Sequence, residues 1–176
     1  MTKASGKAIA TARAFVDAQR EYAAAAPDGD WADTAIRAYL QAVAEPSKVV
    51  LGMPFYGHGW RTTNVTPGLC LAATGIPRGT FEKGVDDYEV LAARNAQSFH
   101  DEKTGTHWTF DGSTFWSFDD PLSASWKADY ANCRALRGMM LWELSGDDPA
   151  GSLLAGMSSQ LWSSRSACHE VWPPLP

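Results

Sequence analysis

The first part of the chain contains two successive helical patterns. Residues 7–26 are rich in alanine and carry apolar side chains at helical spacing, and the sequence PDG at residues 27–29 ends this pattern. Asp30 then stands where a helix N-cap is needed, ahead of an apolar stripe that runs from Ile36 to Val43. We therefore predict two consecutive helices, the second ending before Glu45.

Two later runs are apolar without alternation. Residues 48–55 read KVVLGMPF, and residues 138–145 read GMMLWELS. Continuous apolar runs of this length are typical of parallel strands that are buried on both faces. Because Pro54 has no N–H to donate to a strand ladder, the first strand is predicted to end there. Residues 56–60 (YGHGW) are expected to follow as an aromatic loop.

The segment between these two strands has a different pattern. Residues 61–84 are rich in Thr, Gly and Pro, which predicts a loop, and residues 86–93 form a short helix candidate. Three brief strand patterns follow, with Lys-Thr-Gly and Asp-Gly turn sequences between them, at residues 97–101, 106–110 and 114–118. This succession predicts an antiparallel meander.

Two further helices are signalled by acidic caps followed by proline. Asp120 precedes Pro121 at a helix start, and Asp148 precedes Pro149 in the same way. The first of these helices carries an apolar stripe at Leu122, Trp126, Tyr130, Cys133 and Leu136, and the second carries Leu153, Leu154, Met157 and Leu161. The elements together predict an α/β protein in which two parallel strands and their helices enclose a small α+β insertion.

Composition narrows the classes of partner. The chain has 176 residues, of which 45% are hydrophobic, so it is long enough to bury a core. Its 15 basic and 20 acidic side chains give a net charge of -5, which argues against nucleic acid because phosphate binding needs clustered cations. We expect no membrane span, because no run approaches the roughly 20 apolar residues that one requires.

Cysteine and histidine spacing predicts neither a metal site nor a disulfide framework. The three Cys are widely separated, and Cys133 is expected to be a small buried apolar residue on its helix. The His residues at positions 58, 100, 107 and 169 do not have metal-ligand spacing. Nucleotide-binding glycine motifs are also missing, so the sequence predicts no metal and no cofactor.

Candidate chemistry lies where the two parallel strands end, since functional residues gather at the carboxyl ends of such strands. Trp142 stands at the end of the second strand, where its flat face suits stacking on a sugar ring. Glu143 follows it and is expected to point to the opposite face. The acidic pairs at 119–120 and 147–148 are placed for helix capping, so spacing alone identifies no catalytic carboxylate.

Three segments carry a resemblance to a known family. The sequences SKVVLGMPFYG (47–57), WSFDDP (116–121) and GMMLWELSGDD (138–148) resemble the C-terminal part of family 18 glycoside hydrolases, and bacterial chitinases most of all. GTFEKG at 79–84, with Asp87-Tyr88, resembles the start of the insertion domain of those enzymes. The likeness covers about residues 31–162.

The resemblance implies an incomplete (β/α)8 TIM barrel that holds the last two βα units. Residues 31–60 and 115–162 would belong to the barrel, and residues 61–114 would form the α+β insertion domain. Residues 1–30 form an unmatched helical segment, and residues 163–176 are expected to be a tail. The helix at 7–26 is hypothesised to cover surface that the rest of a barrel would otherwise cover.

The resemblance also implies a set of substrate-binding residues for chitin or N-acetylglucosamine oligosaccharides. Trp142 resembles the Trp at the floor of the sugar subsite, while Met140 and Tyr56 resemble residues that line the cleft, and Trp60 is added as a nearby aromatic. His58 stands where these enzymes usually carry Arg. The family's acid, the Glu of a D-G-x-D-x-D-x-E segment, is not in this sequence, so we assign no catalytic residue.

Three functional hypotheses follow. The first is a chitinase-family hydrolase piece that binds substrate but is inactive alone, because the family's substrate-assisted retaining mechanism needs the absent acid. The second is a non-catalytic saccharide-binding remnant, and the third is a non-functional fragment whose Trp residues only fill a core. The expected partners are the saccharide and either the missing N-terminal barrel half or a second copy of the chain. Family members are usually secreted, although the sequence predicts no signal peptide.

Overall fold

The structure is a computed structural model that describes residues 31–42, 45–64, 66–68, 72–102 and 104–161. The helix predicted at 7–26 and the tail predicted at 163–176 lie outside this part of the chain. The chain divides into two units, residues 1–44 and 45–176, which are considered separately. None of the described helices is long and apolar enough to cross a membrane.

The first unit contains helix α2 (Trp31–Ala42), as the second helical pattern predicts. Asp33 and Arg37 lie one turn apart on this helix and form an ion pair, with 2.5 Å between Oδ2 and Nε. Opposite charges at this spacing support a helix locally.

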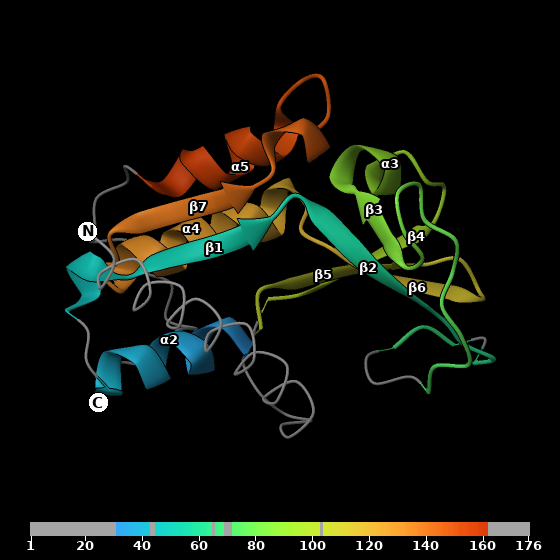
Figure 1. Cartoon of the computed structure of the whole chain (residues 1–176), viewed down its shortest axis with the longest axis horizontal. Helices are drawn as coiled ribbons and strands as arrows, with labels where there is room; N and C mark the ends of the chain where they lie inside the picture. Colours follow the sequence, from blue (N-terminus) through green and yellow to red (C-terminus); the bar gives the residue numbers. More distant parts are fainter. Residues whose placement is uncertain (1–30, 43–44, 65, 69–71, 103, 162–176) are drawn as a thin grey trace, which may run out of the picture. The chain divides into compact units, whose positions relative to one another are not determined.

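Two parallel strands begin the second unit, and the sequence prediction of their pairing is confirmed. β1 (Val50–Pro54) runs parallel to β7 (Gly138–Trp142) in a continuous register from the Val50–Gly138 pair to the Pro54–Trp142 pair (Figure 1). A short 3-10 helix, η1 (Pro46–Lys48), precedes β1, and η2 (Leu144–Gly146) follows β7.

The two faces of this parallel pair differ in burial, so the prediction of strands buried on both faces is wrong. Leu51 and Met53 point into the core on one face, whereas Val50, Met140 and Trp142 are exposed on the other. Helices α4 (Pro121–Cys133) and α5 (Ser152–Leu161) supply residues to the core on the buried side. The described residues place no such layer over Met140 and Trp142.

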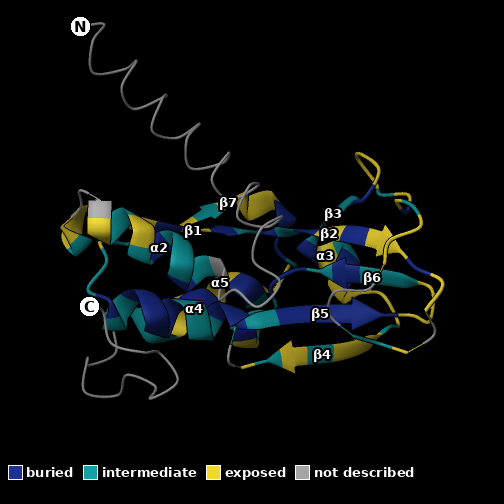
Figure 2. Cartoon of the chain, turned by 90° about the horizontal axis from the view of Figure 1, so that it is seen from below, coloured by how far each residue is buried: buried dark blue, intermediate teal, exposed yellow. Residues whose placement is uncertain are grey.

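A five-stranded antiparallel sheet, in the order β3-β2-β6-β5-β4, forms the rest of the unit. The predicted meander is confirmed, with β5 at the buried centre of its three strands and β4 at the sheet edge (Figure 2). Its elements are β2 (Tyr56–Arg61), β3 (Val85–Asp87), α3 (Tyr88–Ala92), β4 (Gln97–Asp101), β5 (Thr106–Phe110) and β6 (Thr114–Ser117).

The aromatic segment after Pro54 is a strand, and the prediction of a loop there is wrong. β2 pairs with β3 on one side and with β6 on the other. Its glycines, Gly57 and Gly59, are buried, and their missing side chains allow β6 to approach closely. The glycines that suggested a loop are therefore a requirement of tight packing.

The predicted start of α4 is confirmed, whereas the predicted start of α5 at Pro149 is wrong, because α5 begins at Ser152 and Pro149 lies in a turn. Asp120 and Ser123 form a capping box, in which the Ser123 N–H donates to Asp120 Oδ1 at 2.9 Å and the Asp120 N–H donates to Ser123 Oγ at 3.0 Å. Asp148 accepts from the Ser152 N–H at 2.9 Å. Asp147 accepts from the N–H groups of Leu153 and Leu154, the two residues that follow Ser152. Both acidic residues of the second pair therefore cap α5.

The predicted apolar stripe of α4 is only partly correct. Leu122 is 47% exposed, whereas Tyr130 and the alanines at positions 124, 128 and 131 are buried. The small alanine side chains allow close packing of this helix.

Cys133, expected to be a free apolar residue, is disulfide-bonded. Widely separated cysteines gave no local signal of this bond, because chain spacing does not reveal which residues meet in space.

The close packing around Gly57 of β2 yields the first testable prediction. A Cβ added at Gly57 would lie 2.6 Å from Leu91 Cδ1, 2.6 Å from Phe118 Cβ and 2.7 Å from the Ser117 carbonyl oxygen. Gly57→Ala should therefore lower the free energy of unfolding by about 1–3 kcal/mol through overpacking. Urea denaturation followed by circular dichroism measures the change.

The matched control is Gly75→Ala, because a Cβ at Gly75 meets no atom within 4 Å. This substitution should change the free energy of unfolding by no more than about 0.5 kcal/mol. Equal stability of the two variants would contradict the packing interpretation of β2.

Candidate functional site

Trp142 and Met140 are presented on the open face of the parallel pair. Trp142 ends β7 with 65% of its surface exposed, and Met140, two residues earlier on the same face, is 51% exposed. The backbone beneath them is held firmly, because the Phe55 N–H donates to the Trp142 carbonyl at 2.8 Å. The Trp142 ring is therefore open to solvent and does not fill the core, while its backbone is anchored to Phe55.

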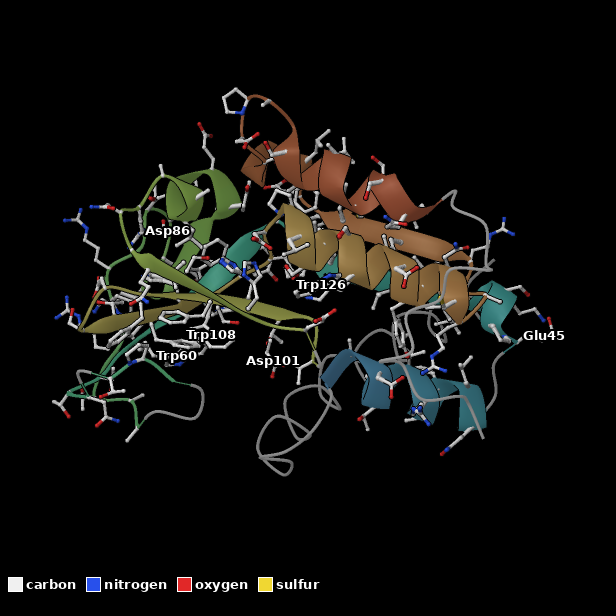
Figure 3. The ribbon with its side chains drawn as sticks, turned by 180° about the vertical axis from the view of Figure 1, so that it is seen from behind. Glu45, Trp60, Asp86, Asp101, Trp108 and Trp126 are labelled. Carbon is white, nitrogen blue, oxygen red and sulfur yellow. The ribbon has the colours of Figure 1, made fainter. Side chains whose placement is uncertain are left out.

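Tyr56, His58 and Trp60 form a row of rings on β2. Their side chains alternate with the buried glycines, so they share one face of the strand. The Tyr56 and His58 ring centroids are 5.6 Å apart with the rings nearly perpendicular, and those of His58 and Trp60 are 6.2 Å apart. Trp60, labelled in Figure 3, remains 40% exposed.

This row continues across the antiparallel sheet through Phe115. The Phe115 ring lies 6.1 Å from the Trp60 ring and 6.4 Å from the Trp108 ring, while Trp108 stacks on Phe99 at 5.6 Å. Exposure falls along this path, from 40% at Trp60 to 8% at Trp108. The inner members therefore support the sheet, and the outer ones are available to a ligand.

The five residues predicted from the sequence thus occupy two connected elements. Met140 and Trp142 lie on β7, and Tyr56, His58 and Trp60 lie on β2, which begins two residues after Pro54, the partner of Trp142 in the parallel ladder. The backbone brings the start of one group close to the end of the other. Flat, partly exposed rings in this arrangement can stack on the apolar faces of sugar units.

Asp87 is a candidate that sequence reasoning did not select. It lies opposite Tyr56 in the pairing of β2 with β3. Burial raises the pKa of the Asp87 carboxyl above its ordinary value of 3.8, and the negative charges of Glu143, Asp86 and Glu89 raise it further. The influence of Glu143 places the residue after Trp142 within electrostatic range of Asp87. Only the pairing register, which the sequence does not specify, could have identified it.

Neighbouring carboxylates have structural partners. Asp86 is 1% exposed, accepts from the Thr80 N–H at 2.6 Å and forms an ion pair with Arg94. These residues line a pocket of about 370 Å³ together with Arg78 and Gly79, and Asp86 is labelled in Figure 3. The Arg94 guanidinium also lies 4.5 Å from the Trp116 ring centroid. This pocket is therefore built around the ion pair of Asp86 with Arg94.

The acidic pairs considered for catalysis are likewise engaged. Asp119 is 4% exposed and binds Lys127 Nζ at 2.6 Å, while its neighbour caps α4. Asp147 and Asp148 cap α5 through the hydrogen bonds described above. Helix capping and ion pairing therefore account for both pairs, and Asp87 and Glu143 are the carboxylates near the exposed rings. The Trp142–Glu143 peptide bond is cis.

The architecture defines an α/β protein with exposed aromatic rings at the carboxyl ends of its parallel strands. Residues 19–147 match the family described as glycosyl hydrolases family 18. The chain belongs to this family. The match begins inside the first thirty residues, which the sequence motifs had left unassigned.

The relatives and structural neighbours include several chitinases. Chitinase 63 of Streptomyces plicatus is 37% identical over 115 residues, which cover 65% of this chain and 18% of that protein. The catalytic domain of psychrophilic chitinase B from Arthrobacter TAD20 superposes with a TM-score of 0.69 at 36% identity, covering 77% of this chain and 30% of that domain. This chain therefore spans less than a third of the length of either protein.

Two plant structures extend the comparison. A mutant of a class V chitinase from Nicotiana tobaccum, in complex with NAG4, gives a TM-score of 0.67 at 28% identity. It is matched over 73% of this chain and 38% of its own. A chitinase-like agglutinin from Robinia pseudoacacia gives 0.66 at 29% identity, over 78% of this chain and 39% of its own.

The environment of Asp87 predicts a pH-dependent effect on stability. Because its pKa is raised on folding, the group favours the folded state at pH values below 3.8, and this contribution is lost as the pH rises through the raised pKa. Asn at this position does not ionise. The stability of Asp87→Asn relative to the wild type should therefore increase with pH and level off by neutral pH, as measured by urea denaturation from about pH 4 to pH 7.

Glu82→Gln is the control, since it removes one negative charge from an exposed side chain. It should not reproduce the pH-dependent gain. A second variant, Glu143→Gln, should reduce the effect of Asp87→Asn, because one of the charges that raise the Asp87 pKa is gone. An identical pH profile for the wild type and Asp87→Asn would contradict the assignment.

Proposed function

We propose that residues 45–161 form the C-terminal part of a chitinase-type domain and supply one wall of its cleft for N-acetylglucosamine oligosaccharides. The observation that carries this proposal is the 65% exposure of Trp142 at the end of β7. Trp is highly buried on average, so a Trp ring that is this exposed at the end of a parallel strand is informative. Met140, Tyr56, His58 and Trp60 would extend the binding surface on either side of it.

In this proposal the parallel pair is a segment of an incomplete (β/α)8 barrel. β1 with α4, and β7 with α5, would be its last two βα units, and residues 61–114 would form the inserted domain between β1 and α4. The exposed face of β1 and β7 supports this, because the inward face of a complete barrel strand is covered by side chains from the other strands. TM-scores of 0.65–0.69 to chitinase-type structures lend further support.

The reaction in which this wall would take part is hydrolysis of the β-1,4 link between N-acetylglucosamine units. In the substrate-assisted mechanism the substrate's own N-acetyl group acts as the nucleophile, so the protein must supply a general acid. The family's acidic segment, D-G-x-D-x-D-x-E, is not in the sequence. The chain would therefore hold and orient sugar rings while the acid comes from elsewhere.

The missing acidic segment would have to come from the N-terminal half of a barrel, because a second copy of this chain lacks it as well and would only cover the open face. Val50, Met140 and Trp142 present apolar surface on the open side of a sheet with two unpaired edges among the described residues. Such edges and faces favour association. A partner that completes the barrel would cover this face and leave the carboxyl ends of the strands open to substrate.

A non-catalytic saccharide-binding role is the second candidate. The resemblance to a chitinase-like agglutinin favours it, because that protein shares this fold at a comparable TM-score. The two roles differ in what the purified chain does with the missing half added. A hydrolase piece gains turnover on addition of a barrel half that carries the acidic segment, whereas a binding remnant gains none.

The role of Trp142 is tested by binding. Trp142→Ala should weaken the affinity for a tetramer of N-acetylglucosamine by roughly tenfold, which corresponds to about 1.4 kcal/mol for the lost stacking surface. Isothermal titration calorimetry gives the affinity, and tryptophan fluorescence of the wild type reports the same event.

Phe81→Ala is the matched control, because Phe81 is an exposed aromatic residue, at 77%, outside the candidate site. It should bind the tetramer as the wild type does. A wild type that does not bind, or equal losses in both variants, would remove Trp142 from the site.

The absence of the acid is tested by turnover. The purified chain should not hydrolyse oligomers of N-acetylglucosamine, since loss of a positioned general acid alone lowers the rate by about 10²–10⁴-fold. Release of shorter sugars, separated by chromatography, is the measurement. Robust turnover that is abolished by Asp87→Asn or Glu143→Gln would show that the chain carries its own acid and would overturn this prediction.

A further inference from the structure

A cluster of two histidines and one carboxylate lies at the junction of the antiparallel sheet with α4. His100 on β4 and His107 on β5 face each other in the strand register, and Asp120 is the N-cap of α4. One ligand-type atom from each of the three residues lies within 4.8 Å of the other two. Histidine spacing along the chain concealed this cluster, because strand pairing and a helix start bring its members together.

His107 is held in the orientation and tautomer that a metal ligand requires. Its Nδ1 lies 3.1 Å from the Phe118 carbonyl oxygen, which can only accept, so Nδ1 carries the proton. Nε2 then accepts a hydrogen bond from the Ser98 hydroxyl at 2.7 Å, and an ion bound at Nε2 would take the place of that hydroxyl proton. Metal-binding histidines commonly donate their second ring N–H to a backbone carbonyl in this way. Burial also lowers the pKa of His107, which favours the neutral ring.

Asp120 has one oxygen for the helix and another for the cluster. Its Oδ1 accepts from the Ser123 N–H at 2.9 Å, whereas its Oδ2 lies 2.7 Å from His100 Nε2. An ion bound at Oδ2 would leave the helix cap intact. The nearby Asp119 is already neutralised by Lys127, 2.6 Å away. The carboxylate of Asp120 is therefore available as a charged ligand.

His100 is the adjustable member. It lies on the edge strand of the sheet, its side chain is 29% exposed, and the edge of the Trp126 ring contacts it at 5.8 Å between centroids (Figure 3 labels Trp126 on α4). A tetrahedral ion with bonds of about 2.0–2.1 Å needs its ligands roughly 3.4 Å apart. His100 Nε2 and Asp120 Oδ2, which are 2.7 Å apart, must therefore separate slightly, whereas the longest ligand separation, at most 4.8 Å, must shorten by up to about 1.4 Å. The exposed His100 can rotate to achieve both.

We propose that His100 Nε2, His107 Nε2 and Asp120 Oδ2 form a binding site for a divalent metal ion of the zinc class. Two imidazoles and one carboxylate are a ligand set that suits zinc and cobalt, and water or the Ser98 hydroxyl completes the fourth position. Binding requires the proton that His100 Nε2 shares with Asp120 to leave that nitrogen, either to Nδ1 of the same ring or to solvent. The ion would join the edge strand β4 to the start of α4.

The test uses the tag-free chain, treated with a chelator and then titrated with Zn²⁺ or Co²⁺. We expect saturable binding of one ion at the cluster and a rise in Tm with Zn²⁺ concentration, because an ion that binds only the folded state stabilises it by mass action. Co²⁺ should give the visible absorption of a tetrahedral complex. Both signals should weaken at least tenfold in affinity in His100→Ala.

The exposed position of His100 makes it the first variant, since loss of the buried His107 affects folding as well. Asp120→Asn keeps an oxygen for the Ser123 N–H but removes the charge, so it should retain the helix cap and weaken Co²⁺ binding. His58→Ala is the control for histidines that bind ions adventitiously, and it should bind as the wild type does. Unchanged affinity in His100→Ala, or a wild type without saturable binding, would overturn the proposal.

Discussion

The described part of the second unit depends on the backbone of Phe55. This residue is fully buried between the parallel pair and the antiparallel sheet. Its N–H donates to Trp142 at the end of β7, and its carbonyl accepts from the Tyr88 N–H at the start of α3, at 2.9 Å. One peptide segment thus closes the parallel ladder and anchors the insertion. Gly146 is required beside it, because a Cβ there would lie 2.4 Å from the Phe55 oxygen.

This junction explains why the exposed rings and the two carboxylates meet. The chain leaves β1 at Phe55 and enters β2 at once, so Tyr56 starts a new sheet beside the end of β7. Asp87, paired with Tyr56, then lies within electrostatic range of Glu143. The packing around Phe55 therefore places Asp87 and the backbone of Trp142 at the same junction. The partial burial of Asp87 at this junction, together with the nearby negative charges, raises its pKa.

A second connection, at Asp120, gives the sheet and the helices a shared polar contact. The same carboxylate caps α4 and meets His100 from the edge strand. Burial raises its pKa, but hydrogen bonds from the Ser123 N–H and His100 and the positive potential of the histidines outweigh that effect, and the net pKa is lowered. Capping a helix and holding an ion are compatible here because the two carboxylate oxygens face different partners.

The sequence by itself determined the elements whose signals are local. Turn sequences and alternation located β4, β5 and β6, while Asp120 with Pro121 marked the start of α4. Trp142 could be selected because it ends an apolar run. Tertiary structure alone decided that β2 is a strand, that one face of β1 and β7 is open, and that His100, His107 and Asp120 meet. These features depend on which segments pair, and residues far apart in the chain carry no local signal of their pairing.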